Sequence, residues 1–194
     1  NVKFLSSKIE NFTSQGLATD IGVYYFSDYR PYSFTAVIRN LGYQITPYEE
    51  VREEIAYDIA IGASFLMSDV PIKWHLTMNS LQQWNLAVPN PSNSNTDLDG
   101  NTEEESISFL DNMMRHFVIG VELFPESKFN LRFGYNFRRA AELKLAEART
   151  FAGLSAGFGL KMGRFKFDYA FTKYHPVDNS STFTLYIDLT RKGF

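Results

Sequence analysis

The residues best suited to bind a ligand are the oxygen-bearing side chains between residues 95 and 100. Asn95, Asp97 and Asp99 stand at alternate positions and are followed by glycine. This spacing matches the first half of a calcium-binding loop, in which alternate side chains supply oxygen ligands. Position twelve of such a loop, where an acid is expected, is Ser106. A solvated loop rich in Asn and Asp accounts for the stretch equally simply and is the favoured interpretation.

Other signatures of chemistry are missing from the sequence. The three histidines, His75, His116 and His175, fall on separate segments without the spacing of metal ligands. Cysteine is absent, and no nucleophile elbow or phosphate-binding glycine pattern occurs. The formal net charge of -3 argues against a nucleic-acid partner. The sequence therefore shows no catalytic residues, and we expect no cofactor.

Charged residues alternate strictly with apolar ones over residues 129–138. Apolar side chains occupy the odd positions and polar side chains or glycine the even ones. A strand sends successive side chains to opposite faces, so this segment has one apolar and one polar face. Segments 117–123, 152–162 and 164–172 repeat the pattern, which predicts four consecutive strands.

The composition of these faces predicts a transmembrane β-barrel. Soluble sandwiches seldom combine such an aromatic face with so much glycine on the other. A barrel in a bilayer needs this arrangement, with apolar side chains toward lipid and small or polar ones toward the lumen. Aromatic residues make up 16% of the chain, and no apolar run reaches the ~18 residues of a membrane helix. Phe133 and Phe167 are thus expected to face lipid, and Arg132 and Lys166 the lumen.

The charges expected inside the barrel carry both signs. They are Asp20, Arg39, Asp58, Lys73, Glu122, Arg132, Arg138, Lys166 and Asp168. They could line a pore or bind a polar ligand. The favoured interpretation is a network of paired charges that fills a narrow lumen, because burying an unpaired charge is costly.

Five further segments show the same alternation, which gives nine antiparallel strands in a single domain over residues 1–194. These segments are 15–26, 32–45, 57–67, 72–79 and 182–190. Residues 1–12 are expected to form a loop or plug. Short connections alternate with long ones, as in outer-membrane barrels whose longer loops are extracellular. An odd strand count and the lack of a signal peptide predict that an N-terminal part is missing; one unrecognised strand is the alternative.

The longest connection, residues 84–114, combines a Pro/Asn/Ser-rich stretch with a short helix. The helix is predicted over 103–114, with Thr102 as N-cap and Glu105 completing a capping box. Ile107, Leu110 and Met114 share one face of it. This stripe either folds back over the barrel mouth, which is slightly favoured for the helix itself, or docks a partner.

Several motifs resemble the PorQ family of outer-membrane barrels, which belongs to the type IX secretion system. They are Asn40-Leu41-Gly42, residues 115–122, residues 131–139 with Glu142-Leu143-Lys144, residues 153–160, Asp168-Tyr169-Ala170 and residues 181–184. The likeness extends over most of the chain from about residue 15, and the family is similar to the wider fatty-acid-transporter-like (FadL) group. It implies a barrel of about fourteen strands, of which this chain would supply the C-terminal part.

The resemblance also implies a function, that of a membrane anchor that is not an enzyme. Proteins of this family anchor a surface protein (PorZ) beside the PorU sortase and PorV, in a complex that attaches secreted cargo to lipopolysaccharide. The expected location is the bacterial outer membrane. Two alternatives remain at this point: a FadL-like transporter of hydrophobic ligands, and a soluble lipid-binding barrel with the aromatic stripes inside.

Overall fold

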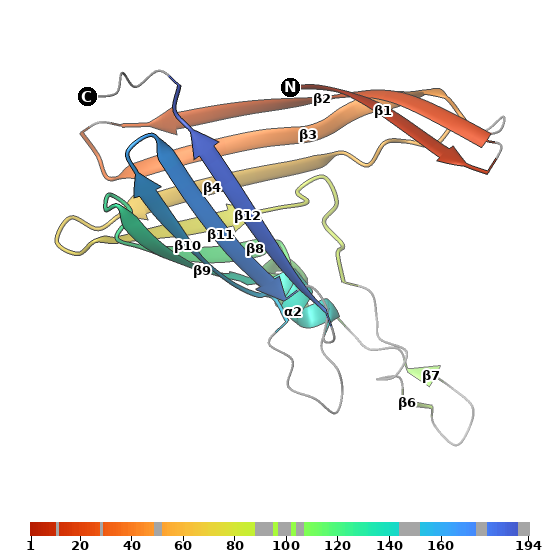
Figure 1. The fold of residues 1–194 in the computed structure, drawn as a ribbon. Helices are drawn as coiled ribbons and strands as arrows, with labels where there is room; N and C mark the ends of the chain where they lie inside the picture. The colour runs from red at the N-terminus through yellow and green to blue at the C-terminus, as the bar shows by residue number, and fades with distance from the viewer. Residues whose placement is uncertain are drawn as a thin grey trace.

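The protein is all-β, with ten strands in one antiparallel sheet (Figure 1). The computed structural model describes residues 1–10, 12–27, 29–48, 52–87, 95–96, 102–103, 107–143, 152–173 and 178–189. Each strand of the sheet pairs with the strands that precede and follow it along the chain. The strands are β1 (Val2–Ile9), β2 (Phe12–Phe26), β3 (Tyr32–Thr46), β4 (Asp58–Leu66), β5 (Ile72–Met78), β8 (Phe117–Leu123), β9 (Phe129–Asn136), β10 (Leu154–Met162), β11 (Phe165–Lys173) and β12 (Asn179–Ile187).

The register separates the two faces of this sheet cleanly. One row of directly opposed residues is apolar and runs through Tyr25, Phe34, Ala63, Leu76, Ile119, Tyr135 and Leu154. The neighbouring row is small or polar and runs through Ser33, Ser64, His75, Gly120, Gly134, Ser155, Thr172 and Ser180. We call these the outer and the inner face. The predicted alternation is thereby confirmed, with Phe133 and Phe167 outer and Arg132 and Lys166 inner.

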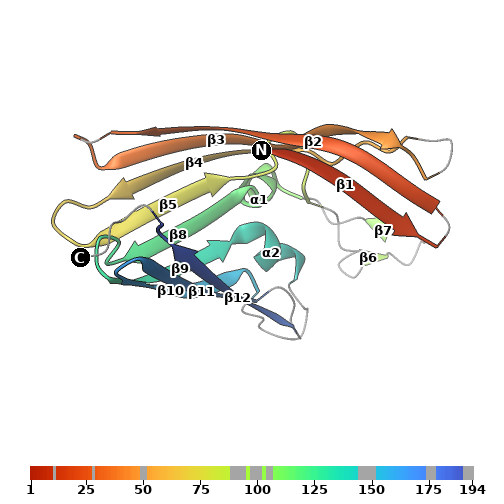
Figure 2. The same cartoon turned by 45° about the horizontal axis from the view of Figure 1, so that its top comes forward.

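Burial shows that the apolar face is the exposed one. The sheet curls strongly, so that its two edges turn toward one another (Figure 2). Phe133 on the outer face is 48% exposed, whereas the inner side chains of Asp168 and Glu122 are only 13% and 16% exposed. The usual arrangement of a soluble protein, with apolar residues inside and polar residues outside, is therefore reversed in this sheet.

Aromatic rings gather on the outer face of β9–β12. Phe158 lies 5.5 Å from Tyr169 and 6.2 Å from Phe167 between ring centroids, and Tyr169 lies 4.8 Å from Phe183. Contacts of this kind add about 0.5–1.5 kcal/mol each beyond the area they bury. They hold the last four strands together on the side away from the polar face.

The sequence-based count of nine strands is wrong. Residues 2–9, expected to be a loop or plug, form β1, which pairs with β2 from Val2–Thr19 to Ile9–Phe12. The sheet therefore has an even number of strands, and the odd count gives no reason to expect a missing part. Over the described residues the sheet is not closed, and β1 and β12 are its two edges.

The alternation of short and long connections is confirmed with two exceptions. Short turns follow β2, β4, β8 and β10, and longer segments follow β3, β5 and β9. The link from β11 to β12, predicted to be a long connection, covers only residues 174–178 and is as short as the turns after β2, β4 and β8. The second exception is the link from β1 to β2: Ile9 pairs directly with Phe12, so a tight turn lies at the end of the sheet that carries the long connections.

The helix in the longest connection is shorter than predicted. The connection contains β6 (Asn95–Thr96), β7 (Thr102–Glu103) and α1 (Phe109–Met114). Ser108, not Thr102, is the N-cap, and its hydroxyl accepts a hydrogen bond from the Asp111 N–H at 3.1 Å. Thr102 instead pairs with Thr96 in a two-stranded ribbon, and Glu105 lies outside the described residues. Among the described helices none has the length and hydrophobicity to cross a membrane.

Helix α2 (Phe137–Glu142) ends the predicted strand 129–138 early. The Asn136 side chain accepts a hydrogen bond from the Arg139 N–H at 3.0 Å and so caps the helix. Arg138, predicted to be a strand residue facing the lumen, lies in this helix and pairs with Glu142 one helical turn later at 2.7 Å. Its assignment to the strand is wrong because a local cap overrides the alternating pattern, whereas its lumenal orientation stays a prediction.

A β-bulge where β2 pairs with β3 depends on Gly42. Asn40 adopts a positive φ of 56°, and the register shifts beside it. A Cβ at Gly42 would collide with the Leu17 carbonyl oxygen and lie 2.5 Å from the Ala18 Cα. The two strands therefore approach each other as closely as glycine allows.

We expect Gly42→Ala to destabilise the sheet by about 1–3 kcal/mol, because backbone atoms must move to admit the methyl group. Gly62→Ala is the matched control: its Cβ would meet nothing closer than 3.6 Å. Urea unfolding of the two detergent-solubilised variants measures the difference. Equal stability of the two variants would show that the close approach at Gly42 is not structurally required.

Candidate functional site: a charged network on the inner face

The densest group of ionisable side chains spans five strands of the inner face. Arg132 on β9 bridges two acids, with Nε 3.3 Å from Glu122 Oε1 on β8 and Nη2 2.8 Å from Asp168 Oδ1 on β11. Lys166 Nζ lies 3.1 Å from the second oxygen of Asp168. His75 Nε2 on β5 lies 3.7 Å from Glu122 Oε2. We call His75, Glu122, Arg132, Lys166 and Asp168 the inner network.

Glycines on β10 make this network possible. Arg132 is opposite Gly157 in the register, and Asp168 is opposite Gly159. Because these two positions carry no side chain, the guanidinium passes over β10 and reaches the second strand along. The alternating pattern of residues 152–162 predicts both glycines on the polar face, and in the structure the end of the Arg132 side chain occupies space that Gly159 leaves.

Asn130 completes the centre of the inner network. It is opposite Gly159 and only 8% exposed. Its Oδ1 is the one buried side-chain polar atom without a hydrogen-bond partner among the residues described. A buried acceptor without a partner costs roughly 1–3 kcal/mol, so a water molecule is the expected donor at this point.

Gly159→Ala is expected to disrupt the inner network. The new Cβ would lie 2.5 Å from Asn130 Oδ1, 2.6 Å from Asp168 Oδ1 and 3.0 Å from Arg132 Nη2. The Arg132 side chain is long and can shift, but Asn130 and Asp168 are short and poorly exposed, and moving them should lower the free energy of unfolding by about 1–2 kcal/mol. A double-mutant cycle with Asp168→Ala tests the cause: the alanine should cost much less where Asp168 is already absent. Additive effects would contradict the assignment.

Two further inner acids are paired as well. Asp20 Oδ2 lies 2.7 Å from Lys3 Nζ, and its Oδ1 accepts a hydrogen bond from the Asn40 N–H at 2.9 Å. Asp58 pairs with Arg39 at 3.1 Å. The expectation that inner charges are paired is thus confirmed for these two acids and for Glu122 and Asp168, whereas Lys73 makes no ion pair among the described residues. Apart from Lys166 with Asp168, which share β11, these pairs join different strands and so also fix the register.

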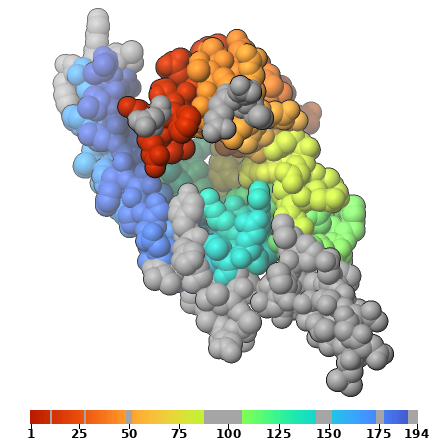
Figure 3. All heavy atoms as spheres, turned by 90° about the vertical axis from the view of Figure 1, so that its right-hand side faces the viewer, coloured from red at the N-terminus to blue at the C-terminus, as the bar shows by residue number. Residues whose placement is uncertain are grey.

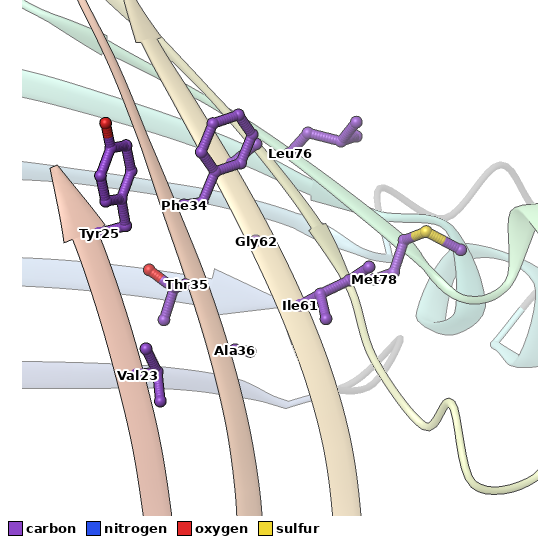
Figure 4. A pocket seen from close by; sticks show the side chains of 10 residues that line it. Val23, Tyr25, Phe34, Thr35, Ala36, Ile61, Gly62, Leu76 and Met78 are labelled. Atoms are coloured by element: carbon purple, nitrogen blue, oxygen red, sulfur yellow. The ribbon is translucent and has the colours of Figure 1, made fainter. Parts of the chain in front are cut away.

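Two hollows lie back to back on β2–β5 and differ in character. The inner one, of about 360 Å³, is lined by hydroxyl-bearing and small residues with Arg39, Lys73 and His75 at its sides. The outer one, of about 430 Å³, is apolar and opens over Ala36 and Ala63 between larger side chains such as Phe34, Leu76 and Met78 (Figure 4). Of these two hollows, the one suited to an apolar ligand is therefore on the outer face.

The base of the longest connection is tied down by one buried amide. Asn112 Oδ1 accepts hydrogen bonds from the N–H groups of Leu86 and Ala87 at 2.9 and 3.1 Å, and its Nδ2 donates to the Trp84 carbonyl at 2.6 Å. His116, only 1% exposed, stacks on the Trp84 ring at 5.2 Å between centroids. Residues on both sides of the connection are thus joined into one folded unit.

The residues predicted to dock a partner do not form one stripe. Leu110 is 61% exposed, whereas Ile107 and Met114 are half-buried. The larger exposed side chain is Phe109, at 68%, which the predicted helical face omitted. Phe109 also contacts the Trp84 ring at 5.3 Å, so the exposed pair Phe109 and Leu110 stands on the anchored base.

The calcium-loop prediction is not addressed, since Asp97 and Asp99 lie outside the described residues, as does His175. Asn95 belongs to β6 and pairs with Glu103. Over the described part of the chain, no three His, Asp or Glu residues are grouped as a metal site would require.

Comparisons with protein-family models, with curated proteins and with solved structures find no match for this chain.

Proposed function

We propose that this protein is a non-enzymatic outer-membrane β-barrel whose long-connection end anchors a surface partner. The observation that carries the proposal is the inverted sheet, with an exposed aromatic and aliphatic outer face and a polar, largely paired inner face. Apolar surface costs roughly 25 cal/mol per Å² in water, so a face this extensive needs a cover. Lipid covers it without any further element of protein.

The two edge strands of the sheet are compatible with part of a barrel wall, but in a membrane both edges need a pairing strand. Lipid cannot satisfy the unpaired N–H and C=O groups of an edge strand, so β1 and β12 must each be paired in the bilayer. The FadL-like barrel of about fourteen strands, suggested by the sequence motifs, supplies that pairing through further strands. The barrel of about fourteen strands is part of the proposal.

Anchoring is proposed to occur where the long connections gather. Phe109 and Leu110 are exposed apolar side chains on a base held by Asn112 and His116. Apolar anchors held rigidly within a polar surround are the usual composition of a protein–protein contact. The partner proposed from the PorQ-family resemblance is a PorZ-like surface protein, beside a PorU/PorV-type sortase complex acting on lipopolysaccharide.

The double variant Phe109→Ser/Leu110→Ser tests the anchoring. We expect the barrel to reach the outer membrane at normal abundance, while the partner is released from the cell surface. Removing two anchors of this kind typically costs several kcal/mol of binding. Val70→Ser is the matched control, since Val70 is an exposed apolar residue on a short turn at the opposite end. Retention of the partner by the double variant would overturn the anchoring proposal.

The alternative function, FadL-like transport of hydrophobic ligands, needs an apolar lumenal pocket. Among the described residues, the apolar hollow of about 430 Å³ lies on the outer face and the hollow of about 360 Å³ beside Lys73 is polar, so we favour the anchor over the transporter.

A further inference from the structure

The inner face carries more positive than negative charge. Its seven cationic residues are Lys3, Arg39, Lys73, Arg132, Lys161, Arg164 and Lys166, and its five acids are Asp20, Asp58, Glu122, Asp168 and Asp188. Four of the acids are engaged by Lys3, Arg39, Arg132 and Lys166. The fifth, Asp188, lies beside Arg164, whose carbonyl oxygen accepts a hydrogen bond from the Asp188 N–H at 2.9 Å. Lys73 and Lys161 make no ion pair within the described part of the chain. These two lysines are the source of the excess.

The strand register makes this excess of positive charge unfavourable unless a counter-ion is bound. Lys161 is directly opposite Lys166 on the β10–β11 hairpin. Like charges at directly opposed positions of a sheet destabilise it. Within the described part of the chain, the acid that pairs with Lys166 is Asp168, which is shared with Arg132. The hollow of about 280 Å³ beside Lys161 is lined by three cations, Lys161, Arg164 and Lys166, and by one acid, Asp188, so it offers an anion a favourable place.

The inner face also has room for water and ions. Glycine occupies the inner positions 62, 120, 134, 157 and 159, and the polar hollow of about 360 Å³ lies beside Lys73. Seen from the end that carries the long connections, the molecule is hollowed between the N-terminal strands and α2 (Figure 3). The Oδ1 atom of buried Asn130 has no hydrogen-bond partner among the described residues, so it independently calls for a donor such as water in this interior.

We propose that the inner face lines a water-filled passage that conducts small inorganic anions in preference to cations. Rings of Arg and Lys select anions in pores, because the local potential concentrates the oppositely charged ion. Lys73 and Lys161 set the selectivity, and the paired charges of the inner network supply the fixed wall between them. This inference rests on the proposed membrane barrel and goes beyond its anchoring function.

The test is electrical. The full chain, purified in mild detergent from outer membranes, is inserted into a planar bilayer under a tenfold KCl gradient, and the reversal potential gives the permeability ratio of chloride to potassium. We expect a ratio above one in the native protein and a fall toward one in Lys73→Gln/Lys161→Gln. Each single variant should give an intermediate ratio. Lys173→Gln, which removes the same charge from the outer face of β11, should leave the ratio unchanged.

Two outcomes contradict the inference in different ways. A protein that enters the membrane but conducts nothing, or prefers potassium, overturns the anion passage and leaves the anchor proposal standing. A protein that never enters the bilayer overturns the membrane barrel and the passage together. An equal shift of the ratio in Lys173→Gln would show that Lys73 and Lys161 do not determine the selectivity.

Discussion

Leu76→Arg is expected to prevent most of the protein from reaching the outer membrane in folded form. Leu76 lies on the outer face near the middle of β5 and is 44% exposed. An arginine on the lipid side of a barrel costs about 2–4 kcal/mol at the bilayer midplane. That penalty is a large fraction of the stability of a typical domain. The folded fraction is measured by heat-modifiable gel mobility of the outer-membrane fraction.

Thr77→Arg provides the matched control on the next residue. Thr77 points to the inner face and lines the polar hollow of about 360 Å³, which offers the new side chain room and water. We expect near-normal folding and abundance. If Thr77→Arg were the more damaging change, the two faces would be reversed, and the protein would be a soluble barrel with its aromatic face inside.

Alternation with a period of two predicted most of the sheet correctly. Nine strands were located to within a few residues because each keeps its apolar side chains on one face. The exception, β1, does not: Val2 and Phe4 lie on the outer face, whereas Leu5 and Ile9 share the inner face with Lys3. Without clean alternation, the segment has no strand signal of its own, and pairing with β2 decides its structure.

The inner network shows what a periodic pattern can and cannot give. The alternation of apolar and polar positions alone predicted that Glu122, Arg132, Lys166 and Asp168 share one face. Their mutual contacts depend on the register, which brings Asp168 beside Gly159 and leaves a path for Arg132. The register arises from long-range pairing along the whole sheet and cannot be read from one strand.

Local capping accounts for the errors in the helices. The pattern 129–138 continues through Phe137 and Arg138, but the Asn136 side chain caps α2 and ends the strand. At the longest connection, Thr102 with Glu105 matched a capping box, yet Ser108 caps the helix and Thr102 joins β7. Ser108 with Asp111 three residues later was the signal that could have located α1.

Asn112→Leu is expected to release the longest connection from the barrel while the sheet stays folded. Asn112 is only 6% exposed, and its amide pairs with two backbone N–H groups and one carbonyl. Leucine has nearly the same size but can make none of these bonds. The buried Leu86 N–H and the partly buried Ala87 N–H would lose their acceptor, whereas the Trp84 carbonyl keeps His116 Nε2 at 3.1 Å. Two such groups left unpaired at about 1–3 kcal/mol each exceed what a local segment can tolerate.

The release can be measured by limited proteolysis of intact cells. Residues 84–116 should become several-fold more sensitive to cleavage in Asn112→Leu, while the barrel keeps its heat-modifiable mobility. Asn85→Leu controls for the loss of an amide, because Asn85 is exposed and no hydrogen bond of its side chain is found among the described residues. Since Phe109 and Leu110 stand on this base, partner retention should fall in parallel with cleavage. Cleavage that rises while the partner stays bound would move the docking surface away from α1, to another of the long connections.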